Sequence, residues 1–282
     1  MSVVRQCVSA TTGRRFTTPL SSGDRCRPSL DRSLQRPEGV FQQSAGRSAA
    51  DSTEALRYAL KEKAGVKWWE QTAASGTLEV RHAPVRPGVA LLVLPDGPEM
   101  SQRGARPWHV NVLRMRPVLR AVSCVVSLEE ALLGHVHYRS RGWNAGAVVD
   151  DVLRALNDLD RLPGRMRTVL VGHGMGARAA LQAAVHPQVH GVVGLAPWLP
   201  DHEPVVQLAG RGVFLAQHAT SAMGVARARE YTQRARTAGA RADVQLVRGG
   251  DAWMLRHPVA WHRAAAAGVR HVLAADDQDG KG

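Results

Sequence analysis

The chain has 282 residues, 44% of them hydrophobic, which is enough to bury one large core and does not require two. Its formal net charge is +13, but the basic residues do not gather with aromatic residues, so no specific nucleic-acid binding is expected. Three cysteines without C-x-x-C spacing predict neither a disulfide framework nor a zinc site. The expectation is therefore a protein of the reducing cytoplasm, with no membrane insertion because the apolar runs are only strand-sized.

The N-terminal part of the chain differs in composition from the rest. Residues 1–50 are rich in Arg, Ser and Thr and poor in acids, and they show no sustained helix or strand period. A disordered basic extension is predicted, with an organelle transit peptide as the alternative. An Asp-x-x-Glu capping pattern then predicts a helix over 51–64. The folded domain is expected to span 51–275, followed by a flexible tail at 276–282.

From about residue 77, short apolar runs alternate with helical stretches. The predicted strands are 77–83, 88–95, 132–138, 167–172, 190–196, 212–217 and 242–247, and the predicted helices are 108–120, 147–161, 175–186, 224–238 and 258–274. Near-continuous Val and Leu runs separated by helices indicate an α/β domain whose mostly parallel sheet is covered on both faces. The first strand or two are candidates for antiparallel pairing.

The stretch VLVGHGMGARAAL, residues 169–181, fits two patterns. Gly172, Gly174 and Ala177 spell G-x-G-x-x-A, a dinucleotide-binding turn, which normally follows the first strand of its domain. Here the turn follows a middle strand, and the acidic residue expected at the tip of the next strand comes late, at Asp201. The same stretch also spells the nucleophile elbow G-x-S-x-G with Gly174 in place of the serine. The sequence favours the elbow.

Several other stretches carry the same likeness. VGHGMGARAAL resembles the VGHSMGGRAAL type of string in α/β-hydrolases, and RPWHVNVLRMRP, YRSRGWNAG, VVGLAPWLP and GGDAWMLR resemble stretches of small bacterial esterases or lipases of that fold. The resemblance covers roughly 77–275. It implies the α/β-hydrolase fold, and the shortness of 196–210 predicts no large lid domain.

The resemblance also implies where a catalytic triad would lie. The nucleophile position falls on Gly174, the acid position on Ser221 in QHATS, and the general-base position on Ala252 in GGDAWML. None of these three vacated positions offers the oxygen, carboxylate or imidazole that serine-hydrolase chemistry needs. The sequence therefore predicts a degenerate triad and a pseudoenzyme that acts, if at all, by binding.

The oxyanion hole is built from backbone N–H groups, so it can outlast the triad. Its candidate donors are Met175 and, in the loop after the second predicted strand, Asp96 and Gly97. That loop reads PDG where the resembled family commonly has HGG or PGG. A persisting hole predicts a small acyl or anionic ligand, and no cofactor is expected.

Two other hypotheses remain open. Displaced residues, His218 with Asp251, could support an active hydrolase for an ester or similar small substrate, or the basic surface and N-terminal arm could serve a protein partner whose nature is unknown. Candidate pocket residues are His173, Trp198, His218, Asp251 and Trp253. Trp108 and Trp143 belong to the same tryptophan-bearing segments, which either line a pocket or pack in the core.

Two further features are interpreted as structural. His135 and His137 share one strand face at a spacing that metal ligands use, but no third ligand is evident, so no metal site is predicted. Cys124, in the apolar run SCVVS, is expected to be a core residue.

Overall fold

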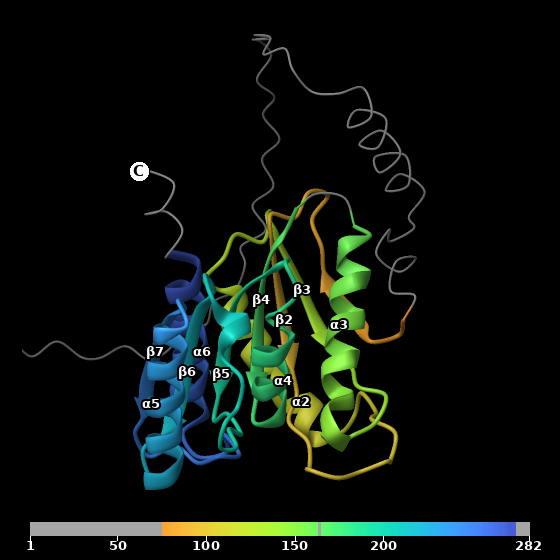
Figure 1. Ribbon diagram of the computed structural model, residues 1–282. Helices are drawn as coiled ribbons and strands as arrows, with labels where there is room; N and C mark the ends of the chain where they lie inside the picture. The colour runs from red at the N-terminus through yellow and green to blue at the C-terminus, as the bar shows by residue number, and fades with distance from the viewer. Residues whose placement is uncertain (1–74, 163–164, 275–282) are drawn as a thin grey trace, which may run out of the picture. The chain divides into compact units, whose positions relative to one another are not determined.

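The computed structural model describes residues 75–162 and 165–274. The extension predicted at 1–50, the helix predicted over 51–64 and the tail at 276–282 lie outside the described residues. Within the described part, a central sheet is flanked by helices (Figure 1).

The sheet has seven strands in the order β1-β3-β2-β4-β5-β6-β7. They are β1 (Leu78–His82), β2 (Val89–Leu94), β3 (Ala131–Val136), β4 (Arg167–His173), β5 (Val189–Leu195), β6 (Gly212–His218) and β7 (Arg241–Val247). All seven predicted strands are present. Only β1 pairs antiparallel, with β3, and every other pairing is parallel.

Within the described residues, five α-helices cover the sheet. They are α2 (Val110–Ser123), α3 (Ala147–Asp160), α4 (Met175–Ala183), α5 (Ala222–Thr237) and α6 (Pro258–Ala274). One apolar core lies between the sheet and α3, α4 and α5, and a second lies between the opposite face and α2 and α6. Because β2 is buried along its whole length by both cores, it reads as an unbroken apolar run rather than an alternating one. β3 is buried along its whole length too, with His135 as its one polar side chain.

Where the helix ends differ from the predictions, local chemistry explains two of the differences. Helix α4 ends at Ala183 rather than 186. Pro187 follows His186, and the residue before a proline is disfavoured in helical conformation. Helix α5 begins at Ala222 rather than 224 because the Ser221 side chain caps it, accepting the N–H of Gly224 at 3.1 Å.

The strand order creates a crevice at the carboxyl edge of the sheet. From β2 the chain crosses to β3 on one side and then to β4 on the other, so β2 and β4 are neighbours that lead away in opposite directions. This reversal of direction is where open α/β sheets bind ligands, because the loops that follow the two strands diverge there. The loops after β2 and β4 carry Asp96 and Gly174.

None of the helices described is long and apolar enough to cross a bilayer.

The expectation that Cys124 is a core residue is wrong. Its side chain is exposed just after α2, and its Sγ donates to the carbonyl oxygen of Arg120 at 3.3 Å. The apolar run around it follows the end of a helix instead of forming a strand.

Candidate functional site

The turn between β4 and α4 has the geometry of a strained strand-to-helix elbow. Gly174 lies at φ 52° and ψ −114°, a backbone conformation that residues with a side chain rarely adopt. A Cβ on Gly172 would lie 2.4 Å from the carbonyl oxygen of Gly176, and one on Gly176 would lie 2.5 Å from that of Pro95. Small residues at these positions therefore let the helix approach the strand and the neighbouring loop.

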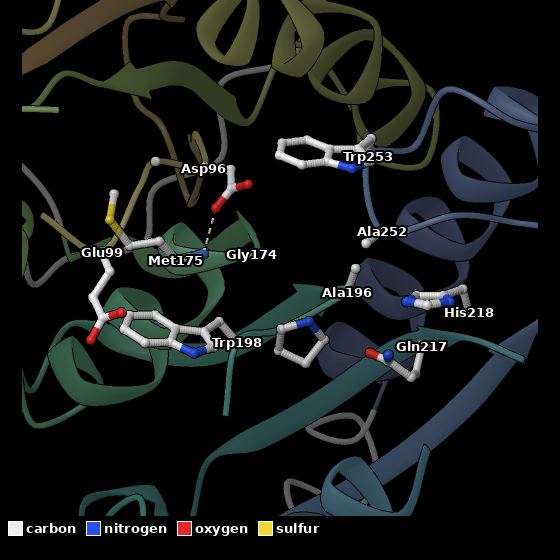
Figure 2. A pocket seen from close by; sticks show the side chains of 12 residues that line it. Asp96, Glu99, Gly174, Met175, Ala196, Trp198, Gln217, His218, Ala252 and Trp253 are labelled. Carbon is white, nitrogen blue, oxygen red and sulfur yellow. Dashed lines mark hydrogen bonds between the residues drawn. The ribbon is translucent and has the colours of Figure 1, made fainter. Parts of the chain in front are cut away.

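A carboxylate from the neighbouring strand lies over this elbow. Asp96 follows β2, and its Oδ1 accepts the backbone N–H of Met175 at 2.8 Å (Figure 2). A Cβ on Gly174 would lie 2.2 Å from Oδ1, 2.5 Å from Cγ and 2.9 Å from Oδ2 of this carboxylate. The Asp96 side chain thus fills the space that a serine at position 174 would need. It also engages the N–H expected to serve as the first oxyanion donor.

The loop that carries Asp96 is held by two further hydrogen bonds. The buried Tyr138 hydroxyl donates to the carbonyl oxygen of Pro95 at 3.1 Å, and Asn111 Nδ2 donates to that of Asp96 at 3.1 Å. Burial raises the pKa of Tyr138 well above its usual value, so this hydroxyl keeps its proton. The loop position that places a carboxylate over the elbow is therefore fixed from two elements.

His173, the last residue of β4, connects the elbow to the loop after β7. Its side chain is fully buried, and its Nε2 donates to the carbonyl oxygen of Ala252 at 2.7 Å. Burial lowers the pKa of His173, which favours the neutral ring. His173 therefore holds the backbone of the loop after β7 in place. It does not line the pocket, although the sequence indicated it as a candidate pocket residue.

A pocket of about 400 Å³ opens beside the elbow, at the carboxyl edge of the sheet. Its walls come from the loops and strand ends after β2, β4, β5, β6 and β7, and Figure 2 shows Asp96 and Trp253 on one side with Gln217 and His218 on another. Two of the three positions that the resemblance assigns to a triad, Gly174 and Ala252, line it, as do the expected residues Trp198, His218 and Trp253. The third of these positions, Ser221, is the N-cap of α5.

The residues proposed as displaced catalytic groups have other partners. Asp251 Oδ1 accepts the backbone N–H groups of Leu255 and Arg256, both at 2.9 Å, so it stabilises its own loop. His218 lies at the end of β6, and its Nδ1 is 2.9 Å from the hydroxyl of Thr220. The structure does not join His218 and Asp251 by a hydrogen bond within its described residues, and Asp251 does not line the pocket described above.

The four tryptophans divide between pocket, core and surface. Trp198 and Trp253 line the pocket, Trp143 is buried and packs edge-on against Trp198 at 5.9 Å, and Trp108 is exposed. The guanidinium of Arg178 lies 4.0 Å from the Trp143 ring and 4.8 Å from the Trp198 ring. The backbone of Trp198 also donates to the carbonyl oxygen of Gly174 at 3.1 Å, which attaches this wall to the elbow.

A buried ion pair secures the same wall. Arg178 Nε lies 2.7 Å from Oε2 of Glu203, whose side chain is 1% exposed. The second oxygen of Glu203 accepts Nε2 of Gln182. Both charges are compensated, which a carboxylate this deeply buried requires.

His135, in β3, and His137, directly after it, lie outside this site. His137 Nε2 is 2.6 Å from Glu79 Oε2, and the rings of His135 and His137 stack with centroids 6.4 Å apart. Burial lowers the pKa of His135 to about 4. Among the residues described, no three His, Cys, Asp or Glu side chains are grouped so that they could hold a metal ion.

Sequence reasoning missed two features of the site. Asp96 was considered only for its backbone, although its side chain engages the Met175 N–H, and the PDG variant of its loop is the signal that could have revealed it. Gln217 was not considered, yet it lines the pocket while only 4% exposed. The sequence around a glutamine near the end of a buried strand does not indicate which cavity its side chain lines.

The comparisons with known proteins agree with this architecture. No protein-family model matches the sequence, and no curated protein sequence matches it. The structure is similar to a dienelactone hydrolase from Anabaena variabilis, with 14% identity, 67% of this chain and 88% of that chain covered, and a TM-score of 0.51. It is also similar to an uncharacterized protein from Bacillus cereus, with 14% identity, 69% of this chain and 62% of that chain covered, and a TM-score of 0.50.

Sheet order, elbow and these similarities together show that the chain has the α/β-hydrolase fold. No large lid is present among the described residues, as the short segment after β5 predicted. At 14% identity the likeness concerns the fold alone. The function of the site therefore depends on its own residues.

Proposed function

We propose that this chain is an α/β-hydrolase-fold protein without serine-hydrolase activity, which acts by binding a small molecule in the pocket beside Gly174. Acyl transfer needs an activated nucleophile, an imidazole and an orienting carboxylate, and Gly174, Ala252 and Ser221 provide none of them at the three vacated positions. The observation that carries the proposal is the hydrogen bond from the Met175 N–H to the Asp96 carboxylate.

The Asp96 carboxylate opposes ester hydrolysis in two ways. It occupies a donor that would otherwise stabilise a developing oxyanion, and losing one such donor costs about 3–4 kcal/mol of transition-state stabilisation. It also places a negative charge beside that oxyanion, and two like charges ~4 Å apart repel by about 4 kcal/mol at an effective dielectric near 20. Together these effects amount to roughly 7 kcal/mol, or about five orders of magnitude in rate.

The alternative, hydrolysis through His218 with Asp251, receives less support. Asp251 already accepts two backbone N–H groups, so orienting an imidazole would disrupt its own loop. His218 would also need a nucleophile, and the nearest elbow position carries no side chain. Ester hydrolysis that depends on His218 would contradict the proposal.

Fluorophosphonate labelling and turnover of p-nitrophenyl esters test the proposal. The full chain and an active serine esterase are treated in parallel with the probe and with esters of increasing acyl length. We expect labelling and turnover for the esterase and neither for this chain, because no activated oxygen faces the pocket. Specific labelling of a serine between 75 and 274, Ser221 included, would overturn the proposal.

A further inference from the structure

The charged side chains that line the pocket are acidic, beside one histidine, His218. Asp96 and Glu99 contribute two carboxylates, and no lysine or arginine within residues 75–162 and 165–274 lines the pocket. Asp96 uses Oδ1 for the Met175 N–H, and its Oδ2 accepts no hydrogen bond from another described residue. In a chain with a net charge of +13, this concentration of unneutralised negative charge stands out as a local feature.

A second, independent group points to a ligand that donates hydrogen bonds. Gln217 is 96% buried, and its Oε1 has no hydrogen-bond partner among the described residues. Its Nε2 lies toward Gly224 of α5, where an added Cβ would be 2.3 Å away, and Figure 2 shows the amide end directed toward the pocket interior near Ala196. A buried acceptor without a partner is costly unless a ligand or a water supplies the missing donor.

The remaining walls suit an apolar body attached to such a donor. Trp198, Trp253, Met175 and Pro197 line the pocket, and Trp253 is 57% exposed. Indole rings attract cations through their faces, and both tryptophans already do so within the protein. Arg178 lies over Trp198 at 4.8 Å and Arg114 over Trp253 at 5.9 Å.

Two sources of positive charge oppose the binding of a cationic ligand. Arg114 and Arg178 stack on the pocket tryptophans, but neither guanidinium is among the residues that line the pocket, and Arg178 is paired with Glu203. The net charge of the chain is spread over the surface and is screened beyond about 8 Å at physiological salt. The carboxylates that line the pocket therefore dominate.

We propose that this pocket binds a small organic ammonium ion, a protonated amine carried on an aromatic or aliphatic body. The amine donates to Asp96 Oδ2 while its apolar part lies against Trp198 and Trp253, and Glu99 adds negative charge at another wall of the pocket. This replaces the acyl or anionic ligand expected from sequence, because that expectation required a free Met175 N–H. The inference rests on the proposed binding function of this pocket, and it specifies the ligand class.

Three probes with one aromatic body and different charge test this assignment. Binding of 2-phenylethylammonium, 2-phenylethanol and 3-phenylpropanoate to the full chain is measured by calorimetry and by tryptophan fluorescence, up to millimolar concentration. We expect the ammonium to bind roughly tenfold tighter than the neutral alcohol, and the carboxylate to bind weakest. Equal binding of ammonium and alcohol, tighter binding of the carboxylate, or no binding of any probe would each overturn the proposal.

Substitutions locate the binding site and separate its groups. Asp96→Asn keeps an oxygen for the Met175 N–H but removes the charge, and it should weaken ammonium binding about tenfold. Glu99→Gln should weaken it less, about threefold, because Glu99 is exposed. Gln217→Leu changes another wall of the pocket and should leave the affinities of all three probes unchanged, because their single polar group lies at Asp96.

A matched control is Glu129→Gln, which removes an exposed carboxylate outside the pocket and should change none of the affinities. Glu99 is exposed, so its variant is expected to fold even if the Asp96 and Gln217 variants do not. Equal effects of Glu99→Gln and Glu129→Gln would refute the site. Failure of the proposed function has a separate readout, since serine labelling would contradict inactivity without affecting the preference for ammonium.

Discussion

Replacing Gly174 by alanine tests whether the Asp96 carboxylate fills the space above the elbow. The new Cβ would lie 2.2 Å from Asp96 Oδ1, far inside any normal contact, and the backbone φ of 52° would be retained by a residue with a side chain. Backbone strain of this kind costs about 1–3 kcal/mol. Displacing Asp96 also breaks a hydrogen bond to a charged group, which contributes about 1.5–3 kcal/mol. The expected loss is therefore roughly 2.5–6 kcal/mol of unfolding free energy.

Gly210→Ala supplies a matched control for the backbone contribution. Gly210 also has a positive φ, 72°, but an added Cβ there meets no atom within 4 Å. Its substitution should therefore cost only the strain, about 1–3 kcal/mol. The difference between the two variants isolates the clash with the carboxylate.

The clash predicts a specific coupling between positions 174 and 96. In an Asp96→Ala background the carboxylate atoms are absent, so Gly174→Ala should cost only about as much as Gly210→Ala. The double variant should then be more stable than the sum of the single losses predicts, by about 1.5–3 kcal/mol. Urea denaturation followed by circular dichroism measures all four species of this cycle. Additive losses, or a Gly174→Ala loss no larger than that of Gly210→Ala, would refute the reasoning.

Three further predictions concern the remaining groups. Unfolded histidine titrates near 6.5, whereas burial holds the pKa of His135 at about 4, so stability is retained above pH 6.5 and falls as the pH drops toward 4. His135→Gln should reduce this decline in unfolding free energy by up to about 3 kcal/mol, as measured by urea denaturation at several pH values. An unchanged dependence of stability on pH would contradict this role of His135. Glu203→Gln leaves Arg178 without its ion-pair partner, so it should lower the free energy of unfolding by about 3 kcal/mol and the Tm by roughly 6–12 °C. The exposed variant Glu129→Gln is the control. A Tm shift for Glu203→Gln below that of the control would be incompatible with the buried pair. The triple variant Gly174→Ser, Ser221→Asp and Ala252→His should give no turnover of p-nitrophenyl acetate unless Asp96→Gly is added. An active triple variant would show that the carboxylate moves aside.

The sequence by itself determined the secondary structure and the class of fold. Uninterrupted Val and Leu runs predicted the strands because a strand buried on both faces has no polar side, and the glycine spacing around Gly174 predicted the elbow because the close approach of strand and helix is a local requirement. Both signals lie within a few consecutive residues, so they can be read without knowing the rest of the fold. The predicted ends of α4 and α5 were less accurate, since Pro187 and the Ser221 cap decide them.

Only the tertiary structure decided what occupies the site. Asp96 and Met175 are 79 positions apart, and they meet because β2 and β4 are adjacent in the sheet. The burial of His173 against the Ala252 carbonyl and the unpartnered oxygen of Gln217 depend in the same way on loops from separate strands. Strand order is set by how the helices pack over the whole sheet, and no short stretch of the sequence encodes it. For this reason, the sequence could indicate a vacated elbow but not the carboxylate that fills it.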